Sequence, residues 1–103
     1  MDEMKKWIVY IWISMLFPTG IWAQINTDRV MMIGRNALYF EDYVLSIQYF
    51  NQVINAKSYL AEPYFYRGLA KLNLDDFQGA ENDCTEALQR NPFVVSAYQV
   101  RGI

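Results

Sequence analysis

Two helical segments are predicted within residues Ala61–Val94, which read AEPYFYRGLAKLNLDDFQGAENDCTEALQRNPFV. The first segment is predicted to begin near Glu62 and Pro63, because an acidic residue and an early proline both suit the first turn of a helix. Asp76 follows a short turn, and its side chain is suited to capping the second helix. Pro92 ends that second helix, because proline cannot continue a helical hydrogen-bond pattern. The stretch is therefore predicted to form a helix–turn–helix unit.

The apolar residues of the second helix recur at intervals of three, four and seven: Phe77, Ala80, Cys84, Ala87 and Leu88. This spacing is typical of one face of an α-helix, so we expect Cys84 to face inward. The acidic residues Glu81 and Asp83 are expected on a solvated part of the same helix. Gly68 and Ala80 lack bulk, which predicts a close approach of the two helices at that point.

A 34-residue spacing extends this pattern to the chain on either side. From Thr27 onward, six residues are identical to the residue 34 positions later: Gly34/Gly68, Leu38/Leu72, Asp42/Asp76, Tyr64/Tyr98, Arg67/Arg101 and Gly68/Gly102. A fixed period of this length is the signature of a repeat architecture.

The second unit resembles the tetratricopeptide repeat, a 34-residue helix–turn–helix with aromatic, Gly, Ala and Pro residues at fixed offsets. The matching framework residues are Tyr64, Gly68, Ala80, Ala87 and Pro92. Two residues depart from the family pattern: Arg67 stands where leucine is usual, and Cys84 where an aromatic is usual. The resemblance implies an all-α fold, an α-solenoid of stacked helix–turn–helix repeats.

By this resemblance the chain divides into a divergent first unit at 24–60, a second unit at 61–94 and the first helix of a truncated third unit at 95–103. Gly34 belongs to the framework of the first unit, and Tyr98 and Gly102 to that of the third. About two repeats fall short of the three that such arrays usually need. We therefore expect the chain to be the amino-terminal piece of a longer protein. The alternative is a complete chain that self-associates through Val95–Ile103.

The amino terminus has the pattern of an export signal. Trp7–Phe17 is an uncharged apolar run that follows two lysines. It is too short to cross a bilayer, which takes roughly 20 apolar residues, but it suits the apolar region of a secretory signal. We expect a signal peptide over 1–23, cleaved between Ala23 and Gln24. An uncleaved membrane anchor and a first core helix are the alternatives.

Composition excludes several kinds of chemistry. The 103-residue chain has a formal net charge of −2, no histidine and one cysteine. A His-based catalytic triad, a His-ligated metal site and an intramolecular disulfide cannot be built from these residues alone. A nucleic-acid surface needs clustered Lys and Arg, which are absent. Cys84 has no histidine to activate it, so we expect a packing role for it and no enzyme activity, cofactor or metal.

Arg67 is unusual because it lies in an otherwise apolar helix and recurs as Arg101. It is expected on the face that adjoins the second helix of its unit, where Asp83 could pair with it. Alternatively, Arg101 reaches back to Asp83. An ion pair that fixes helix packing is favoured over ligand capture, because an arginine on a buried side generally needs such a partner.

The resemblance also implies a concave groove lined by the first helix of each unit. The candidate partner-binding residues are Met31, Met32, Arg35, Tyr39, Phe65, Tyr66 and Leu69, with Leu38 and Leu72 beside them. The clamp by which one subclass of the family grips a terminal carboxylate is absent, apart from Arg35. This lining suits an amphipathic or extended apolar peptide. The alternative is that these residues are ordinary core between repeats.

Together these patterns predict a non-enzymatic scaffold that binds a protein or peptide partner. By its resemblance to exported tetratricopeptide proteins, it is expected in the periplasm or envelope of a bacterium, with membrane contact only if the leader is retained. The alternative hypothesis is the sensory or recruiting front of a longer enzyme or signalling receptor, whose active part lies beyond Ile103.

Overall fold

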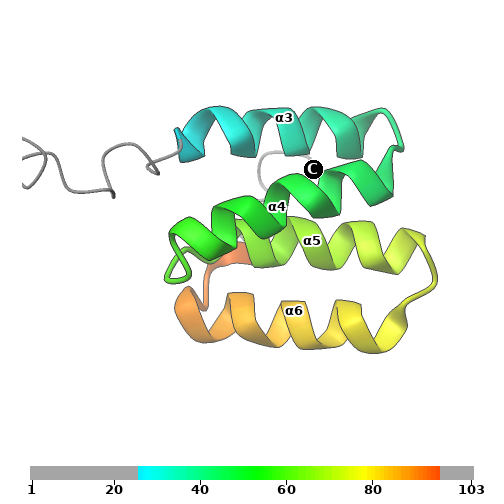
Figure 1. Ribbon diagram of the computed structural model, residues 1–103. Coiled ribbons are helices and arrows are strands. Elements are labelled where there is room, and N and C mark those ends of the chain that lie inside the picture. The colour runs from blue at the N-terminus through cyan, green and yellow to red at the C-terminus, as the bar shows by residue number, and fades with distance from the viewer. Residues whose placement is uncertain (1–25, 96–103) are drawn as a thin grey trace, which may run out of the picture.

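Four α-helices make up the described part of the chain, residues 26–95 of the computed structural model (Figure 1). They are α3 (Thr27–Tyr39), α4 (Tyr43–Ala56), α5 (Glu62–Asn73) and α6 (Phe77–Arg90). No strand occurs within this range, which confirms the all-α prediction. The predicted leader with Ala23 and Gln24, and the predicted third unit with Tyr98 and Gly102, lie outside the described residues.

Acidic and amide side chains cap three of the four helices, and one of these caps was predicted. Asp76 accepts a hydrogen bond from the backbone N–H of Gly79, which confirms the predicted cap of α6. Asp42 accepts from the N–H of Leu45 in the same way at the start of α4, and Asn26 caps α3. The first turn of α5 instead has the predicted acidic residue and proline, without a side-chain cap.

The 34-residue spacing is also present in the backbone. Helix α6 begins and ends 34 positions after α4, and both helices contain 14 residues. Glu41 and Asp75, also 34 apart, both have a positive φ, at 63° and 62°. Non-glycine residues rarely adopt this conformation, so the two tight turns are built alike.

Consecutive helices pack antiparallel, and each intermediate helix is shared between neighbours. Helix α4 packs against both α3 and α5, whereas α6 packs against α5 alone among the described helices. The hydrophobic core consists of Met31, Phe50, Val53, Ala61, Tyr64, Tyr66, Ala87 and Val94. At its centre the rings of Phe50 and Tyr66 stack with centroids 5.8 Å apart, which joins α4 to α5. Such offset stacking stabilises aromatic pairs beyond the burial of their area.

Glycines allow the helices of each pair to come close together. A Cβ added at Gly34 would lie 2.8 Å from the Cε1 atom of Phe50. One added at Gly68 would lie 3.2 Å from the Cβ of Asp83 and 3.3 Å from the carbonyl oxygen of Ala80. The close approach predicted at Gly68 and Ala80 is therefore confirmed.

Two predictions for α6 are wrong. Cys84 is exposed rather than facing inward, and the exposed fractions of Phe77 and Leu88 are 64% and 39%. Conversely, Asp83 is only 2% exposed, although it was expected on a solvated part of the helix. Helix α6 contacts only α5 among the described helices, so its covered face is the one that presents Asp83 and Ala87. The apolar residues counted in the sequence lie partly on this covered face, as Ala87 does, and partly on the adjacent exposed face, as Phe77, Cys84 and Leu88 do.

Candidate functional site

A surface hollow of about 420 Å³ runs along α3. Its lining consists of Met32, Arg35, Asn36, Leu38, Tyr39 and Tyr66. All of these except Tyr66, which comes from α5, belong to α3, so the hollow lies where the first helices of the two pairs meet. Its size and mixed lining suit a few side chains of a bound peptide.

Among the described residues that line this hollow, Arg35 is the only charged one. Its guanidinium carbon lies 5.1 Å from the centroid of the Tyr66 ring, a cation–π arrangement that holds the side chain over the aromatic face. Among the described residues, no carboxylate is within ion-pair distance of Arg35. The guanidinium can therefore donate hydrogen bonds to an acceptor that enters the hollow.

A second hollow of about 330 Å³ adjoins the first and shares Met32 and Arg35 with it. Its lining consists of Thr27, Asp28, Met31, Met32, Arg35, Leu60, Glu62 and Pro63. The two hollows together follow α3 from its first turn to its last.

The structure brings together only some of the residues that the sequence analysis placed in a groove. Met32, Arg35, Tyr39 and Tyr66 share the first hollow, and Met31 lines the second. Phe65 and Leu69 are half-buried and pack against the core instead. Met31 and Tyr66 are themselves core residues. Met31, Phe65, Tyr66 and Leu69 therefore act mainly as core between the helices, which was the alternative to a binding role. Met32, Arg35 and Tyr39 are the exposed members of the predicted set.

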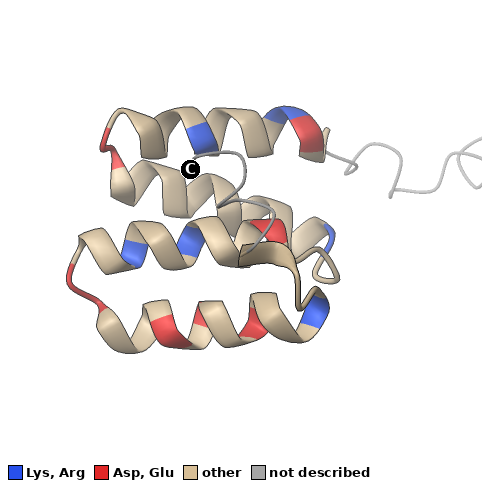
Figure 2. Ribbon diagram, turned by 180° about the vertical axis from the view of Figure 1, so that it is seen from behind, with Lys and Arg blue, Asp and Glu red and all other residues tan. Residues whose placement is uncertain are grey.

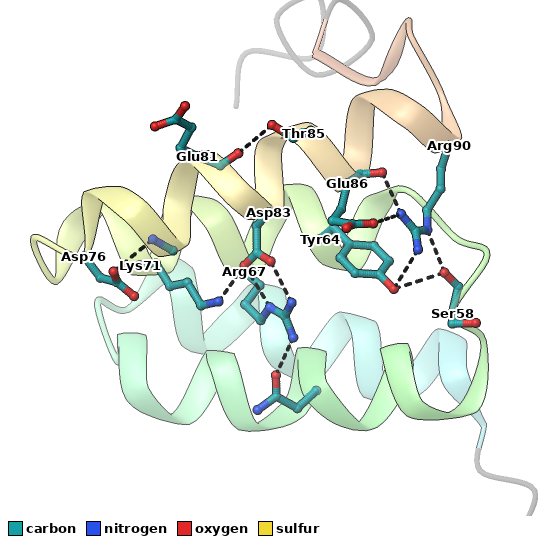
Figure 3. Close-up of polar contacts among 12 residues, drawn as sticks. Ser58, Tyr64, Arg67, Lys71, Asp76, Glu81, Asp83, Thr85, Glu86 and Arg90 are labelled. Atoms are coloured by element: carbon teal, nitrogen blue, oxygen red, sulfur yellow. Dashed lines mark hydrogen bonds and ion pairs between the residues drawn. The ribbon is translucent and has the colours of Figure 1, made fainter.

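The predicted ion pair between Arg67 and Asp83 is present and is bidentate (Figure 3). The Nε and Nη2 atoms of Arg67 donate to the two Asp83 carboxylate oxygens over 2.8 and 2.6 Å. The Nζ atom of Lys71 lies 3.0 Å from the same carboxylate. The Nη1 atom of Arg67 donates to the side-chain oxygen of Asn51 on α4 over 2.8 Å, so one guanidinium joins three helices. The hydrogen bond to Asp83 raises the pKa of Arg67 and outweighs the opposing effect of burial.

A second polar cluster, which the sequence analysis missed, fastens the segment between the two pairs. The Nε atom of Arg90 donates to the carbonyl oxygen of Ser58 over 2.7 Å, and the Tyr64 hydroxyl donates to the same oxygen over 3.1 Å. The guanidinium of Arg90 also lies 4.0 Å from the Tyr64 ring centroid and pairs with Glu86. The sequence indicated only that Arg90 is a basic residue in the last turn of α6. Nothing in the sequence pairs Arg90 with the backbone carbonyl of Ser58, 32 residues away.

The framework residues of the resemblance divide by burial. Gly34, Tyr64, Gly68 and Ala87 are buried, Ala80 is half-buried and Pro92 is exposed just beyond α6. Within residues 26–95 there is no group of three or more His, Cys, Asp and Glu residues that could hold a metal ion. No helix in the same range is both long and apolar enough to span a bilayer. Comparisons with protein families, with curated proteins and with solved structures found no match.

Proposed function

We propose that this chain is an exported, non-enzymatic interaction module of the tetratricopeptide type, which binds a segment of a partner protein along α3. The 34-residue spacing of helices and turns supports the repeat assignment. The observation that carries the binding proposal is the hollow in which Arg35 lies over Tyr66 without a carboxylate partner among the described residues.

The lining of the hollow defines the chemistry of the partner segment. Met32, Leu38 and Tyr39 offer apolar surface, and methionine in particular adapts to side chains of different shapes. Arg35 adds one positive charge with several donors in a planar fork. The matching segment presents an apolar anchor next to a carboxylate or a backbone carbonyl. Burial of the anchor supplies affinity, and the arginine fixes its position.

The proposed export rests on the sequence of the leader, and the bacterial setting on the resemblance to exported tetratricopeptide proteins. The uncharged run Trp7–Phe17 after two lysines supports export, and the envelope of a bacterium is the setting in which such a scaffold would meet its partner. Its role there would be to hold or recruit the partner, without chemistry of its own.

Selection of displayed random peptides of about 12 residues against the purified chain tests the binding proposal. Enriched peptides are expected to combine an aromatic or long aliphatic residue with an acidic residue. Their affinity, measured by fluorescence anisotropy, should fall about tenfold for Arg35→Glu, which inverts the charge in the hollow. It should fall by a similar factor for Met32→Ser together with Tyr39→Ser, because the apolar walls are lost.

Gln48→Ala and Gln52→Ala on α4 are the matched controls, because both side chains are exposed and neither lines a hollow. Their affinities should remain within about twofold of the wild-type value. The proposal is overturned if no peptide is enriched, or if the enriched peptides bind the Arg35→Glu chain as tightly as the unaltered one. Circular dichroism of each variant shows whether the helices are retained.

A further inference from the structure

Exposed apolar side chains gather at the two tight turns, within residues 39–45 and 72–77. We call this surface the turn edge. Of the eleven large hydrophobic residues exposed in the described part of the chain, seven lie in it: Tyr39, Phe40, Val44, Leu45, Leu72, Leu74 and Phe77. Phe40 is 77% exposed, and its ring packs edge-to-face on that of Tyr39. Single exposed apolar residues are ordinary, but a gathering of this kind marks an interaction surface.

The topology brings the two turns to the same end of the molecule. Helices α3 and α5 both run toward this end, and α4 and α6 both run away from it, because consecutive helices are antiparallel. Figures 1 and 2 show both turns at one edge of the four-helix layer. Helix α4 begins at the first turn and α5 ends at the second, and these two helices pack on each other, so both turns lie at the same end of one packed helix pair.

The turn edge is also acidic, with four carboxylates in its two turns, and the two basic residues that flank it, Arg35 and Lys71, precede the turns on α3 and α5. Glu41, Asp42, Asp75 and Asp76 are all exposed, and Figure 2 shows acidic positions at both turns. No Lys or Arg occurs over 36–56 or over 72–89. Lys71 is the nearest cation in the sequence, and its ammonium group is engaged by the buried carboxylate of Asp83. Among the described residues, therefore, no lysine or arginine forms an ion pair with any of these four carboxylates.

We propose that the turn edge is a second docking surface, for a protein segment that presents apolar side chains flanked by lysine or arginine. The apolar residues would be covered by the partner's apolar side chains, and the carboxylates would attract and orient its basic residues. The same charge disfavours the other occupants. Nucleic acids and anionic membranes would be repelled, and a second copy would bring four carboxylates against four.

A probe peptide with a central leucine and tryptophan cluster flanked by lysines tests this proposal in a titration with the full chain. Binding is expected to weaken as NaCl is raised from about 50 mM to about 300 mM, because exposed charges are screened. Phe40→Ser with Phe77→Ser should weaken binding about tenfold. Glu41→Asn with Asp75→Asn should weaken it about fivefold, since two charges are removed. Asparagine tolerates the positive φ at both positions, and the capping residues Asp42 and Asp76 remain.

Asp28→Asn with Glu62→Gln is the matched control, because it removes the same charge from exposed positions in the first turns of α3 and α5, at the end of the helices opposite to the turn edge. Its affinity for the probe should stay within about twofold of wild type. If this control weakens binding as much as Glu41→Asn with Asp75→Asn, the attraction is to net charge and the proposal is wrong. It is also wrong if Phe40→Ser with Phe77→Ser binds the probe normally.

Three further measurements separate this surface from its alternatives. Tyr39 belongs to both surfaces and is left unchanged in these tests. Arg35→Gln should leave probe binding unchanged, so a failure of the hollow along α3 does not remove the turn edge, and the reverse also holds. Sedimentation with vesicles of phosphatidylcholine and phosphatidylglycerol should show no binding that depends on Phe40 and Phe77. Sedimentation velocity should show no dimer that those two substitutions abolish. Either effect would assign the turn edge to a membrane or to a second copy and overturn the proposal.

Discussion

The two helical pairs have nearly the same backbone but are closed by different side chains. In α3–α4, Gly34 faces the ring of Phe50, and the contact is apolar. In α5–α6, the corresponding Gly68 faces Asp83, whose buried carboxylate is held by Arg67 and Lys71. The 34-residue period thus fixes where helices and turns begin, whereas the contact between the helices of a pair can be either aromatic or ionic.

The difference follows from how many neighbours each second helix has. Helix α4 lies between α3 and α5, so Phe50 is covered from both sides and stacks on Tyr66. Helix α6 meets only α5 among the described helices, and Cys84, which stands 34 positions after Phe50, is exposed. Positions 34 residues apart therefore differ in burial according to what packs on the next face of the helix.

The largest expected difference is between Phe50→Ala and Cys84→Ala. Phe50 is completely buried, so its truncation should lower the free energy of unfolding by about 4 kcal/mol through lost burial and a cavity. Cys84→Ala should change it by less than about 0.5 kcal/mol, because the side chain is exposed. Urea unfolding followed by circular dichroism measures both values.

The thiol of Cys84 offers a check that is independent of stability. It is the only cysteine, so its reaction with an aromatic disulfide reagent can be followed without ambiguity. We expect native protein to react nearly as fast as unfolded protein. Slow reaction in the native state, or a large loss of stability in Cys84→Ala, would mean that α6 is covered on this face as α4 is.

The ionic contact gives the next largest effect. Arg67→Ala leaves the buried Asp83 carboxylate with Lys71 alone, and the free energy of unfolding should fall by about 3 kcal/mol. Because the pKa of Arg67 is raised, its stabilising charge is present at every pH below its unfolded-state pKa and is lost only in strongly alkaline solution. The cost of Arg67→Ala should therefore not diminish as the pH rises to about 9.

Giving the second pair the residues of the first tests whether the two contacts are interchangeable. Ile33 and Tyr49 stand 34 positions before Arg67 and Asp83. The double variant Arg67→Ile with Asp83→Tyr should recover stability to within about 1 kcal/mol of wild type, since apolar replacement of a buried ion pair is often neutral. If the double variant is less stable than Arg67→Ala alone, the backbone of α5–α6 is adapted to the ion pair and the equivalence fails.

Much of this arrangement could be predicted from local sequence. Helix caps, an early proline and the recurrence of Gly34 as Gly68 act through neighbouring residues, so they located the turns and the close approaches. The pairing of Arg67 with Asp83 was also predictable, because a charge in an apolar helix needs a partner on the facing helix. The burial of Asp83 and the exposure of Cys84 were not, because they depend on whether a further helix covers α6.

The candidate site was predicted only in part, for a similar reason. Helical periodicity marks apolar positions but does not separate residues that fill the core from those that line a surface. Tyr66 and Met31 have the same character as Tyr39 and Met32, yet the first two are buried and the last two exposed. The attachment of Arg90 to Ser58 joins residues 32 positions apart through a backbone carbonyl, which leaves no mark in a side-chain pattern.

Alanine at the two facing glycines should produce smaller and unequal effects. Gly34→Ala would press a methyl group against Phe50, which is held between helices, and should cost about 2 kcal/mol despite the better helix propensity of alanine. Gly68→Ala should cost about 1 kcal/mol, because its contacts are longer and α6 can shift outward. Thermal unfolding of both variants measures the difference. Equal costs would show that α6 is as tightly confined as α4.

An effect as small as that of Gly68→Ala is expected at the junction between the pairs, where Arg90 reaches back to Ser58. Arg90→Ala should lower the free energy of unfolding by about 1 kcal/mol, through the lost hydrogen bond to the Ser58 carbonyl and the lost contact with the Tyr64 ring. The ion pair with Glu86 adds little, because that carboxylate is nearly half exposed. Arg90→Lys separates these contributions, since it keeps a charge near Glu86 but lacks the planar fork that reaches the carbonyl and the ring together. Chemical denaturation should place the lysine variant close to the alanine variant. A lysine variant as stable as wild type would mean that charge alone joins the two pairs, and that Ser58 is held by Tyr64 without help from Arg90.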